Sequence, residues 1–373
     1  MKVLLITRDT HLNSGWGRQI AMTVREYDSL NVSYTILTES RDITHSHETN
    51  LLRPYGSLVS ILHNLYVTWR LGRTYDVVHA FDVWPYGLYA FAGVVGRKSS
   101  LFLNGIGTYS VAPLYAPFKR LILRIVFART KKIFCISTYT KQEMIRAMPL
   151  LSSKTEVVHM GTTVLPVPSR EAIDALRGRL GITGAPIILS VGAIKDRKGQ
   201  FDTLQAVALL KNKYPRIQYI VVGSTGDRHY VAQMNHFSKE HGLENNLLIT
   251  DSIHTDEDLA SLYSMCDVFA LNSNNDTVSH HFEGFGLVFL EAYQFGKSAV
   301  GSRNCGIEDA IEDGVTGFLC EQGDSVGISI KLDQLLNRAP DAFSAKIRSF
   351  REGFSWKKTA EKYLRSYQES VQS

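Results

Sequence analysis

Two glutamates in the C-terminal half of the chain enclose a short loop that contains two glycines. Glu283 precedes Gly284 and Gly286, and Glu291 follows within a run of helical character that ends at Gly296. At the start of a helix the backbone N–H groups are free and the helix dipole is positive, which favours phosphate binding. Ionised carboxylates accept hydrogen bonds, so one glutamate can reach a sugar hydroxyl while the other accepts from a ribose. The alternative for Glu291 is a residue that caps or pairs on an exposed helix face.

A second glycine-containing loop, Gly15-Trp16-Gly17-Arg18, lies near the N-terminus. Glycines let the backbone approach a ligand closely, and an arginine at this position can meet a phosphate. The pattern by itself also fits a tight turn between a strand and a helix.

Three acidic residues, Asp256-Glu257-Asp258, match the Asp-x-Asp pattern with which some enzymes hold a divalent metal ion. Thr255 precedes them as a helix N-cap, and acidic residues in a first helical turn favour the helix dipole without any metal. The His280-His281 pair and the pair formed by His45 and His47 lack companion ligands at zinc spacing. We therefore expect no metal site.

These residues depend for their positions on short apolar segments that alternate with helical patterns. The N-terminal segments are Val3–Thr7, Val32–Leu37, Asp76–Phe81, Leu101–Gly105, Ile133–Ser137 and Glu156–Met160. The C-terminal segments are Ile187–Val191, Gln218–Gly223, Leu247–Asp251, Val268–Leu271, Ala299–Ser302 and Gly317–Cys320. Such alternation predicts parallel sheets with crossover helices, so the fold class is α/β with two Rossmann-like domains.

The stretch from Thr162 to Pro168, TTVLPVP, is the expected linker, because its prolines push the backbone into extended conformations. We expect an N-terminal domain over residues 1–163, a C-terminal domain over 164–352 and a final segment over 353–373. That segment is too short for a domain and should pack back across one of the others. Its apolar residues at helical spacing are Trp356, Ala360, Tyr363, Leu364 and Tyr367.

The composition describes a globular protein. The chain has 373 residues, of which 44% are hydrophobic and 21% charged, which suits two ordinary cores. A net charge of +5 favours anionic partners in general but does not choose among phosphates, acidic lipids and nucleic acids. Because no zinc-finger, helix-turn-helix or RNA-recognition motif occurs, we expect no nucleic acid partner.

The chain resembles a known family at these motifs, the retaining glycosyltransferases with the two-domain GT-B fold, of the group 1 or family 4 type. The family carries a pair of glutamates separated by seven residues, here Glu283 and Glu291. Three further landmarks follow in the family's order, at 13–18, 191–199 and 304–308, with the sequences NSGWGR, VGAIKDRKG and NCGIE. The resemblance covers nearly the whole chain and implies two Rossmann-like domains facing across a cleft.

The resemblance also implies roles for particular residues. The first glutamate of the family lies beside the transferred sugar, and Lys198, with Arg197, would neutralise the diphosphate leaving group. The second glutamate would bind the ribose of a UDP- or GDP-linked donor. By the same likeness, the residues expected to hold the donor are Gly15, Gly17, Arg18, Gly284, Phe285, Gly286, Leu287 and Glu291. We expect the nucleotide base at Ser252 and Ile253. No cofactor or metal is expected, since the nucleotide-sugar is a substrate.

The sequence departs from the family pattern at two positions. Ala193 stands where an arginine is common, so Arg197 or Lys195 must compensate. Asn104 stands where a histidine usually precedes glycine beside the donor sugar, and asparagine cannot take up a proton near neutral pH. Asn104 is therefore expected to position the sugar, or else it belongs to a plain turn. His79 should end a strand facing the cleft, where it either touches an acceptor or is a satisfied imidazole.

The segment from Pro113 to Lys132 interleaves apolar and basic residues. It predicts a basic amphipathic helix that either lies on an anionic membrane surface or packs on the core with a solvated basic face. The first alternative would make a lipid-linked acceptor the expected partner, in place of a glycan or a small molecule. Because the four cysteines show no paired spacing and no apolar run is long enough to span a bilayer, we expect a cytoplasmic protein, peripheral to the inner membrane face in the first alternative.

Two other functions remain open at this stage. One is a nucleotide-sugar epimerase or hydrolase, because the same fold supports both activities. The other is an inactive nucleotide-sugar-binding partner protein, which the departures at Asn104 and Ala193 motivate.

Overall fold

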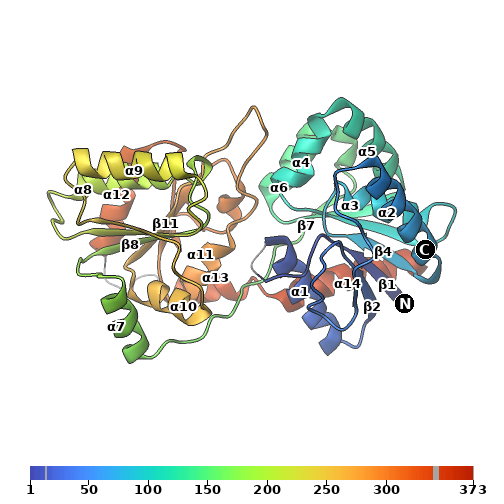
Figure 1. The fold of residues 1–373 in the computed structure, drawn as a ribbon, viewed down its shortest axis with the longest axis horizontal. Coiled ribbons are helices and arrows are strands. Elements are labelled where there is room, and N and C mark those ends of the chain that lie inside the picture. Colours follow the sequence, from blue (N-terminus) through green and yellow to red (C-terminus); the bar gives the residue numbers. More distant parts are fainter. Residues whose placement is uncertain (13–14, 339–343, 373) are drawn as a thin grey trace. The chain divides into compact units, whose positions relative to one another are not determined.

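A computed structural model describes residues 1–12, 15–338 and 344–372. The chain divides into two compact units, one formed by residues 1–161 and 354–373 and the other by residues 162–353. The first boundary falls next to the proline-containing stretch that begins at Thr162. Figure 1 shows the helices and strands of each unit.

The N-terminal unit is built on a parallel sheet with the strand order β3-β2-β1-β4-β5-β6-β7. Its strands are β1 (Lys2–Ile6), β2 (Ser33–Leu37), β3 (Glu48–Thr49), β4 (Val77–Ala80), β5 (Ser100–Gly105), β6 (Thr130–Cys135) and β7 (Thr155–Val157). Its helices are α1 (Gly15–Ser29), α2 (Leu58–Leu71), α3 (Tyr86–Val94), α4 (Thr108–Val111), α5 (Pro117–Arg129), α6 (Thr138–Ala147) and α14 (Trp356–Gln372). The central strands are buried on both faces, as covered parallel strands require.

The C-terminal unit has a six-stranded parallel sheet with the order β10-β9-β8-β11-β12-β13. Its strands are β8 (Ile187–Val191), β9 (Gln218–Val222), β10 (Leu247–Thr250), β11 (Val268–Leu271), β12 (Ala299–Ser302) and β13 (Gly317–Cys320). Its helices are α7 (Arg170–Arg179), α8 (Gln200–Leu210), α9 (Arg228–Glu240), α10 (Asp256–Met265), α11 (Leu287–Gln294), α12 (Ser325–Leu336) and α13 (Ser344–Glu352). The α/β class with two Rossmann-like sheets is confirmed.

Helix α14 is the last element of the chain, yet it packs in the N-terminal unit against α1 and β5 (Figure 1). Ala360, Tyr363 and Tyr367 are fully buried and join the core cluster formed by β1, β2, β4, β5 and β6. The expected final helix that packs back on an earlier domain is thus present. No helix in the described part of the chain combines the length and the hydropathy that a bilayer-spanning segment needs.

Candidate functional site

The glutamate-containing loop and the basic loop meet at one edge of the C-terminal sheet. Strand β11 pairs directly with β8 in parallel, with Phe269 opposite Leu189. The loop after β8 (192–199) and the loop after β11 (272–286) therefore leave the sheet side by side, at the carboxyl ends where ligands bind in open α/β sheets.

Gly199 fixes how closely these two loops approach. Its φ is 62°, in the left-handed region, and a Cβ atom there would lie 1.8 Å from the backbone oxygen of Asn272. Only glycine fits both conditions. The backbone N–H of Asn274 also donates to the carbonyl of Arg197 over 2.8 Å. The two loops thus form one rigid junction that positions the side chains of Arg197 and Lys198.

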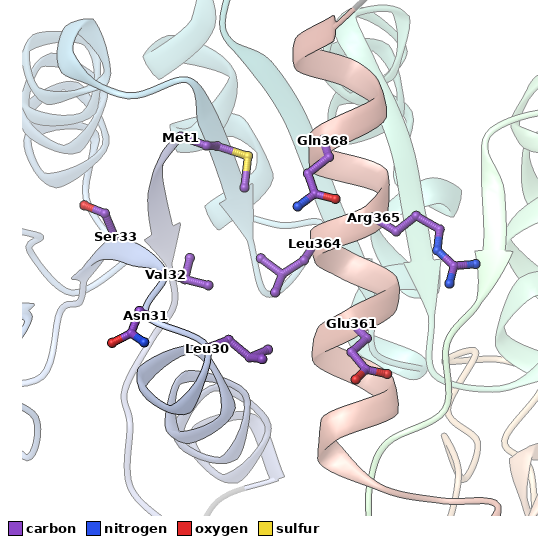
Figure 2. Close-up of a pocket in the computed structure, with 9 residues that line it drawn as sticks. All are labelled: Met1, Leu30, Asn31, Val32, Ser33, Glu361, Leu364, Arg365 and Gln368. Atoms are coloured by element: carbon purple, nitrogen blue, oxygen red, sulfur yellow. The ribbon is translucent and has the colours of Figure 1, made fainter.

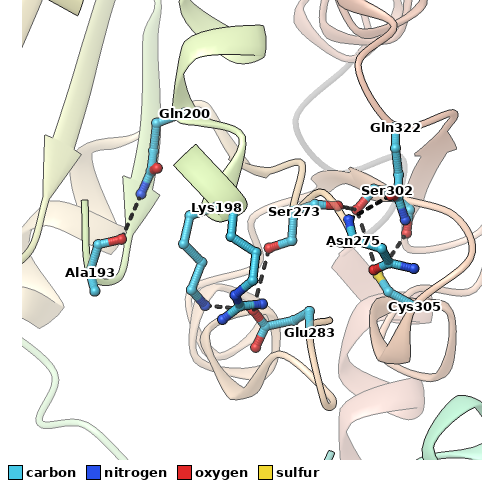
Figure 3. A network of polar contacts seen from close by, with 10 residues as sticks. Ala193, Lys198, Gln200, Ser273, Asn275, Glu283, Ser302, Cys305 and Gln322 are labelled. Carbon is cyan, nitrogen blue, oxygen red and sulfur yellow. Dashed lines mark hydrogen bonds and ion pairs between the residues drawn. The ribbon is translucent and has the colours of Figure 1, made fainter. Parts of the chain in front are cut away.

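Glu283 is the acceptor at the centre of this junction (Figure 3). Its Oε2 accepts from Lys198 Nζ at 2.5 Å, from Ser273 Oγ at 3.3 Å and from Arg197 Nη1 at 3.5 Å. Burial by itself would raise the pKa of Glu283, but the charges of Lys198 and Arg197, with the hydrogen bonds from Lys198 and Ser273, hold it below its usual value. Glu283 is therefore ionised at neutral pH, and none of these three bonds uses its Oε1.

A second layer of contacts holds the glutamate loop in place. Ser302 Oγ, at the end of β12, donates to the carbonyl of Ser273 over 2.6 Å (Figure 3). The N–H of Gly306 donates to the carbonyl of Glu283 over 2.8 Å, and a Cβ atom on Gly306 would lie 2.0 Å from the backbone oxygen of Gly284. The 304–308 segment therefore packs against the glutamate loop, and a side chain at position 306 would displace that loop.

Helix α11 begins directly after this loop. Gly286 is its N-cap residue, with a left-handed φ of 93°, and Leu287 is the first helical residue. The side chain of Phe285 is buried in the core and anchors the turn. The free N–H groups of the first helical turn provide the donors that an anion needs.

Glu291 lies within α11 and is buried, with Oε2 accepting from the hydroxyl of Tyr263 over 3.0 Å. The alternative that placed Glu291 on an exposed helix face is therefore wrong. Its contact with a ribose stays a prediction.

The basic loop carries more positive charge than Glu283 neutralises. Burial, followed by repulsion from Arg197 and Lys198, lowers the pKa of Lys195. The loop thus brings three cations together with one acidic residue of its own, Asp196. Ala193 is exposed in the same loop, and its carbonyl accepts from Gln200 Nε2 over 3.1 Å (Figure 3). The excess of cations suits an anionic ligand such as a diphosphate.

Ser252 and Ile253 follow β10 at the edge of the sheet, where β9 separates them from the strand that carries the basic loop. Ser252 is exposed, and its Oγ lies 2.6 Å from Thr250 Oγ1. Their expected contact with a nucleotide base stays a prediction.

The glycine loop of the N-terminal unit opens α1, which starts at Gly15. A Cβ atom on Gly17 would lie 2.2 Å from the backbone oxygen of His11, so the loop packs too tightly for any side chain there. Arg18 Nε donates to the carbonyl of Leu12 over 3.0 Å. Residues 13 and 14 of this motif lie outside the described residues. Donor contacts of Gly15, Gly17 and Arg18 stay predictions.

Asn104 lies in a different setting from Glu283. It is fully buried at the end of β5, and its Oδ1 accepts from His79 Nε2 over 2.9 Å. His79 Nδ1 lies 2.5 Å from the hydroxyl of Tyr367 on α14, so the imidazole bonds on both sides. Of the two alternatives for His79, the satisfied imidazole is confirmed, because its side chain is buried in the N-terminal core and both ring nitrogens have partners. Contact of Asn104 with a sugar stays a prediction.

The acidic triplet forms the first turn of α10. Thr255 is the N-cap, and its side chain accepts from the N–H of Asp258 over 3.0 Å, which confirms the predicted cap. Asp258 also pairs with Arg179 at 2.6 Å. Within the described ranges, no cluster of three or more His, Cys, Asp or Glu side chains could hold a metal ion.

A hollow of about 590 Å³ lies between α14 and the turn that leads into β2 (Figure 2). Met1 and Ser33 line it, so it lies at the amino ends of β1 and β2. Binding sites of such sheets lie at the opposite, carboxyl edge. We therefore do not place the functional site there.

Sequence reasoning missed the role of Ser273. The signal that could have found it is the polar run Asn272-Ser273-Asn274-Asn275, which directly follows the buried strand β11. Asn274 Nδ2 donates to Asp202 over 2.7 Å and Asn272 Nδ2 donates to Thr203 over 3.0 Å, so this run also fixes the start of α8.

Comparison with protein families identifies both halves of the chain. Residues 172–349 match the model described as "Glycosyl transferases group 1", and residues 13–164 match "Glycosyltransferase Family 4". The two matches together span most of the chain and include both glycine loops and both glutamates.

Individual relatives match over shorter stretches. A GDP-mannose-dependent alpha-(1-6)-phosphatidylinositol monomannoside mannosyltransferase of Mycolicibacterium smegmatis is 24% identical over 59% of this chain and 56% of its own. A D-inositol 3-phosphate glycosyltransferase of Geodermatophilus obscurus is 31% identical over 52% of this chain and 42% of its own. The chain thus spans about half the length of these relatives.

The structure of Anabaena Alr3699/HepE in complex with UDP-glucose matches the fold. It covers 99% of this chain and 100% of its own, with a TM-score of 0.79 at 18% sequence identity. At that identity the match shows a shared fold.

Proposed function

Because the chain belongs to the group 1 and family 4 glycosyltransferases and has their GT-B fold, we propose that it is a retaining hexosyltransferase. It moves a hexosyl unit from a UDP- or GDP-linked donor to a hydroxyl acceptor. The observation that carries this proposal is the contact of Lys198 and Arg197 with the ionised Glu283, in the loop that leads into α11.

The donor diphosphate binds between the basic loop and the first turn of α11. Lys198 and Arg197 stabilise the negative charge that develops on the leaving diphosphate, and the N–H groups near Gly286 and Leu287 add neutral donors. Such fixed donors stabilise a developing charge without reorganising.

The transferred sugar lies beside Glu283. Because Lys198, Arg197 and Ser273 all bond to Oε2, Oε1 can accept from a sugar hydroxyl and orient the ring. Retention then follows when the acceptor oxygen attacks the anomeric carbon from the face that the diphosphate leaves, while the departing phosphate oxygen takes the proton of the acceptor hydroxyl, so no side chain needs to act as a covalent nucleophile. Glu291, buried beneath this loop, accepts from the ribose.

The acceptor is a glycan, a lipid-linked sugar or a small molecule. Support for a lipid-linked acceptor comes from the relative in Mycolicibacterium smegmatis, a phosphatidylinositol monomannoside mannosyltransferase. The same proposal locates the enzyme in the cytoplasm.

Donor binding and transfer test the proposal in two steps. UDP- and GDP-linked hexoses are first screened for binding by calorimetry, and the tightest donor is then offered to lipid-linked, glycan and small-molecule acceptors with mass detection. We expect binding of one donor class and a product heavier than its acceptor by one hexosyl unit, with the anomeric configuration of the donor.

Incubating the donor without an acceptor distinguishes glycosyl transfer from the other activities that this fold supports. Release of free hexose or conversion to an epimeric donor without an acceptor would replace the proposal with a hydrolase or an epimerase. Tight donor binding with no turnover on the whole panel would indicate an inactive binding protein.

A further inference from the structure

We propose that helices α2 and α5 together form a docking face with which the N-terminal unit lies on an anionic membrane surface. The face comprises the exposed apolar residues of both helices, the two tryptophans Trp69 and Trp84, and the cations beside them. This goes beyond the proposed glycosyl transfer, because it concerns a lipid surface and not the reacting substrates.

Helix α2 turns a stripe of large apolar side chains toward solvent. Leu58 is 70% exposed and Leu62 58% exposed, and Tyr66 and Trp69 continue the stripe at helical spacing. Its polar residues Asn64 and Thr68 are instead the buried ones. The helix therefore presents a stripe of large apolar side chains to solvent while it buries two polar ones, which is unusual for a surface helix.

Helix α5 repeats this arrangement. Phe118 is 75% exposed, Leu121 62% and Ile125 58%, and they lie three and four residues apart on one face. Leu123, Val126 and Phe127 bury the opposite face in the core. The sequence left open whether this helix only packs with a solvated basic face, and the structure shows an exposed face that is apolar as well as basic.

The two helices flank α3 and are linked at both ends. Near their starts, Trp84 Nε1 donates to Tyr55 Oη over 3.2 Å, and Lys119 Nζ of α5 lies 5.5 Å from the Trp84 ring. Near their ends, the Arg97 guanidinium lies 5.6 Å from the Trp69 ring of α2.

Arg129, the last residue of α5, completes the second link by donating to the carbonyl of Arg97 over 2.7 Å. Leu88 and Phe91 are half-buried residues of α3, the helix that contacts both α2 and α5. The two apolar stripes therefore belong to one continuous surface, about 20 Å long for helices of this length.

The segments that build this surface carry charge of one sign, and the acidic residue Glu39 from outside them accepts from the N–H of Tyr55. Residues 49–75 and 83–142 contain none of the 36 acidic residues of the chain and twelve of its 41 Lys and Arg residues, which leaves 29 basic against 36 acidic residues elsewhere. The positive excess of the protein is thus concentrated in the segments that build this face. Anionic lipid attracts such cations, and an acyl boundary accepts the apolar side chains between them.

The two tryptophans favour a lipid boundary over a protein partner. Trp69 is stacked by Arg73 at 4.1 Å, and Trp84 lies beneath Lys119. An indole ring with a cation beside it suits the headgroup region of a bilayer, because the ring can contact acyl chains while the cation contacts lipid phosphates. Trp84 also follows the carboxyl end of β4, so a bound membrane would lie near the strand ends that carry Asn104. The relevance of that position to a lipid-linked acceptor rests on the proposed function, whereas docking itself does not.

Vesicle binding of the full chain tests the docking face. Vesicles of equimolar phosphatidylcholine and phosphatidylglycerol are compared with pure phosphatidylcholine at low and high salt, with bound protein measured by co-sedimentation. We expect binding to the anionic vesicles only, weakened by salt, and a blue shift of tryptophan emission that Trp69→Phe and Trp84→Phe each reduce and that the two changes together largely remove.

Three matched double variants locate the contact, each at two exposed apolar residues four positions apart on one helix. They are Leu58→Gln with Leu62→Gln on α2, Leu121→Gln with Ile125→Gln on α5, and, as the control, Val326→Gln with Ile330→Gln on α12, which are 57% and 51% exposed in the C-terminal unit. We expect the α2 and α5 variants each to weaken vesicle affinity by about tenfold and the control to bind like the wild type. Donor binding and the unfolding temperature, unchanged in all three, show that the variants are folded.

Several outcomes would overturn the proposal. Absence of binding to anionic vesicles would do so, as would equal binding by all three variants. Weakened binding in the α5 variant alone would reduce the contact to one helix and reject the two-helix face. Self-association without vesicles that the α2 and α5 variants abolish would assign the face to a second copy of the chain, and capture of an acidic protein with no vesicle binding would assign it to a protein partner.

Discussion

Each unit of the molecule carries a polar cluster at the carboxyl ends of its strands, but the two clusters differ in charge and in closure. In the C-terminal unit, Lys198 and Arg197 donate to the ionised Glu283, and all three side chains retain some exposure to solvent. In the N-terminal unit, Asn104 and His79 are fully buried and bonded to each other and to α14.

The two clusters differ in their net charge and in the kind of partner that would complete them. The C-terminal cluster has more cations than carboxylates and gains by binding an anion. The N-terminal cluster is neutral, and Asn104 Nδ2 is a buried donor in it that has no hydrogen-bond partner among the described residues. We therefore expect changes in the first cluster to appear in transfer and donor affinity, and changes in the second to appear in stability.

We expect the largest effect from Lys198→Ala. Loss of the cation that contacts Glu283 and the leaving diphosphate should lower the transfer rate by about 10³-fold. Initial rates at saturating donor and the donor Kd by calorimetry measure the effect.

The matched control for that variant is Lys213→Ala. Lys213 contacts Asp333 at 2.7 Å, a comparable ion pair on an exposed surface of the same unit. A transfer rate for Lys198→Ala close to that of the control would remove the basic loop from the reaction.

Glu283→Gln should lower transfer by about 10²-fold, because a neutral amide no longer balances the cations or orients the sugar. The lowered pKa of Glu283 adds a pH signature. The carboxylate contributes stability above about pH 4.3, the usual value for Glu, and this contribution is lost as the pH falls through the lower folded-state pKa. The gap in unfolding temperature between wild type and variant should therefore narrow in acid, and a gap of constant size would contradict the ion pair.

Asn104→Ala should act on stability. It leaves His79 Nε2 without its acceptor in a buried site, which costs about 1–3 kcal/mol in the free energy of unfolding. Urea titration measures the loss, and the donor Kd should stay unchanged. The opposite result, slower transfer at unaltered stability, would favour the predicted contact of Asn104 with the sugar.

His79 should make the protein sensitive to mild acid. Burial, partly opposed by the hydrogen bond to Asn104, lowers the pKa of His79 to about 3. Between about pH 6.5 and that value the unfolded state binds a proton that the folded state does not. The free energy of unfolding therefore decreases as the pH is lowered, by up to about 1.4 kcal/mol per pH unit. His79→Gln should flatten this slope, measured by urea titration from pH 4 to 7, whereas His229→Gln, at an exposed histidine, should leave it unchanged.

The smallest effect is expected from Ala193→Arg. An added cation in the exposed part of the basic loop should tighten donor binding by about threefold, and this gain should fade with added salt because the site is open to solvent. Calorimetry at low and high salt checks it. If the variant binds the donor more weakly than the wild type at low salt, the loop already carries all the positive charge that the donor diphosphate can use.

Local signals made much of the fold predictable. The run Ile187–Val191 was predicted with the bounds that β8 has, and Thr255 was predicted as a cap, because both depend on neighbouring residues. Strand β3 was missed, since its two residues form a strand only through pairing with β2. The alternation of apolar segments predicted the two sheets, but it did not predict the short strand pairing at a sheet edge.

The candidate site was less predictable, because its contacts join distant segments. The family resemblance assigned Lys198 and Glu283 to one donor site, but their 2.5 Å contact depends on how closely Gly199 lets the two loops approach. Burial of Asn104 could not be seen either, since Tyr367 of α14, far along the chain, helps to close that site.

Helix α14 has a consequence for how the protein is made. Ala360, Tyr363 and Tyr367 complete the core of the unit that the ribosome synthesises first, yet they are translated after the entire second unit. The first unit therefore keeps part of its sheet uncovered until α14 has been translated. A chain released before residue 356 would keep that apolar surface open to chaperones and proteases.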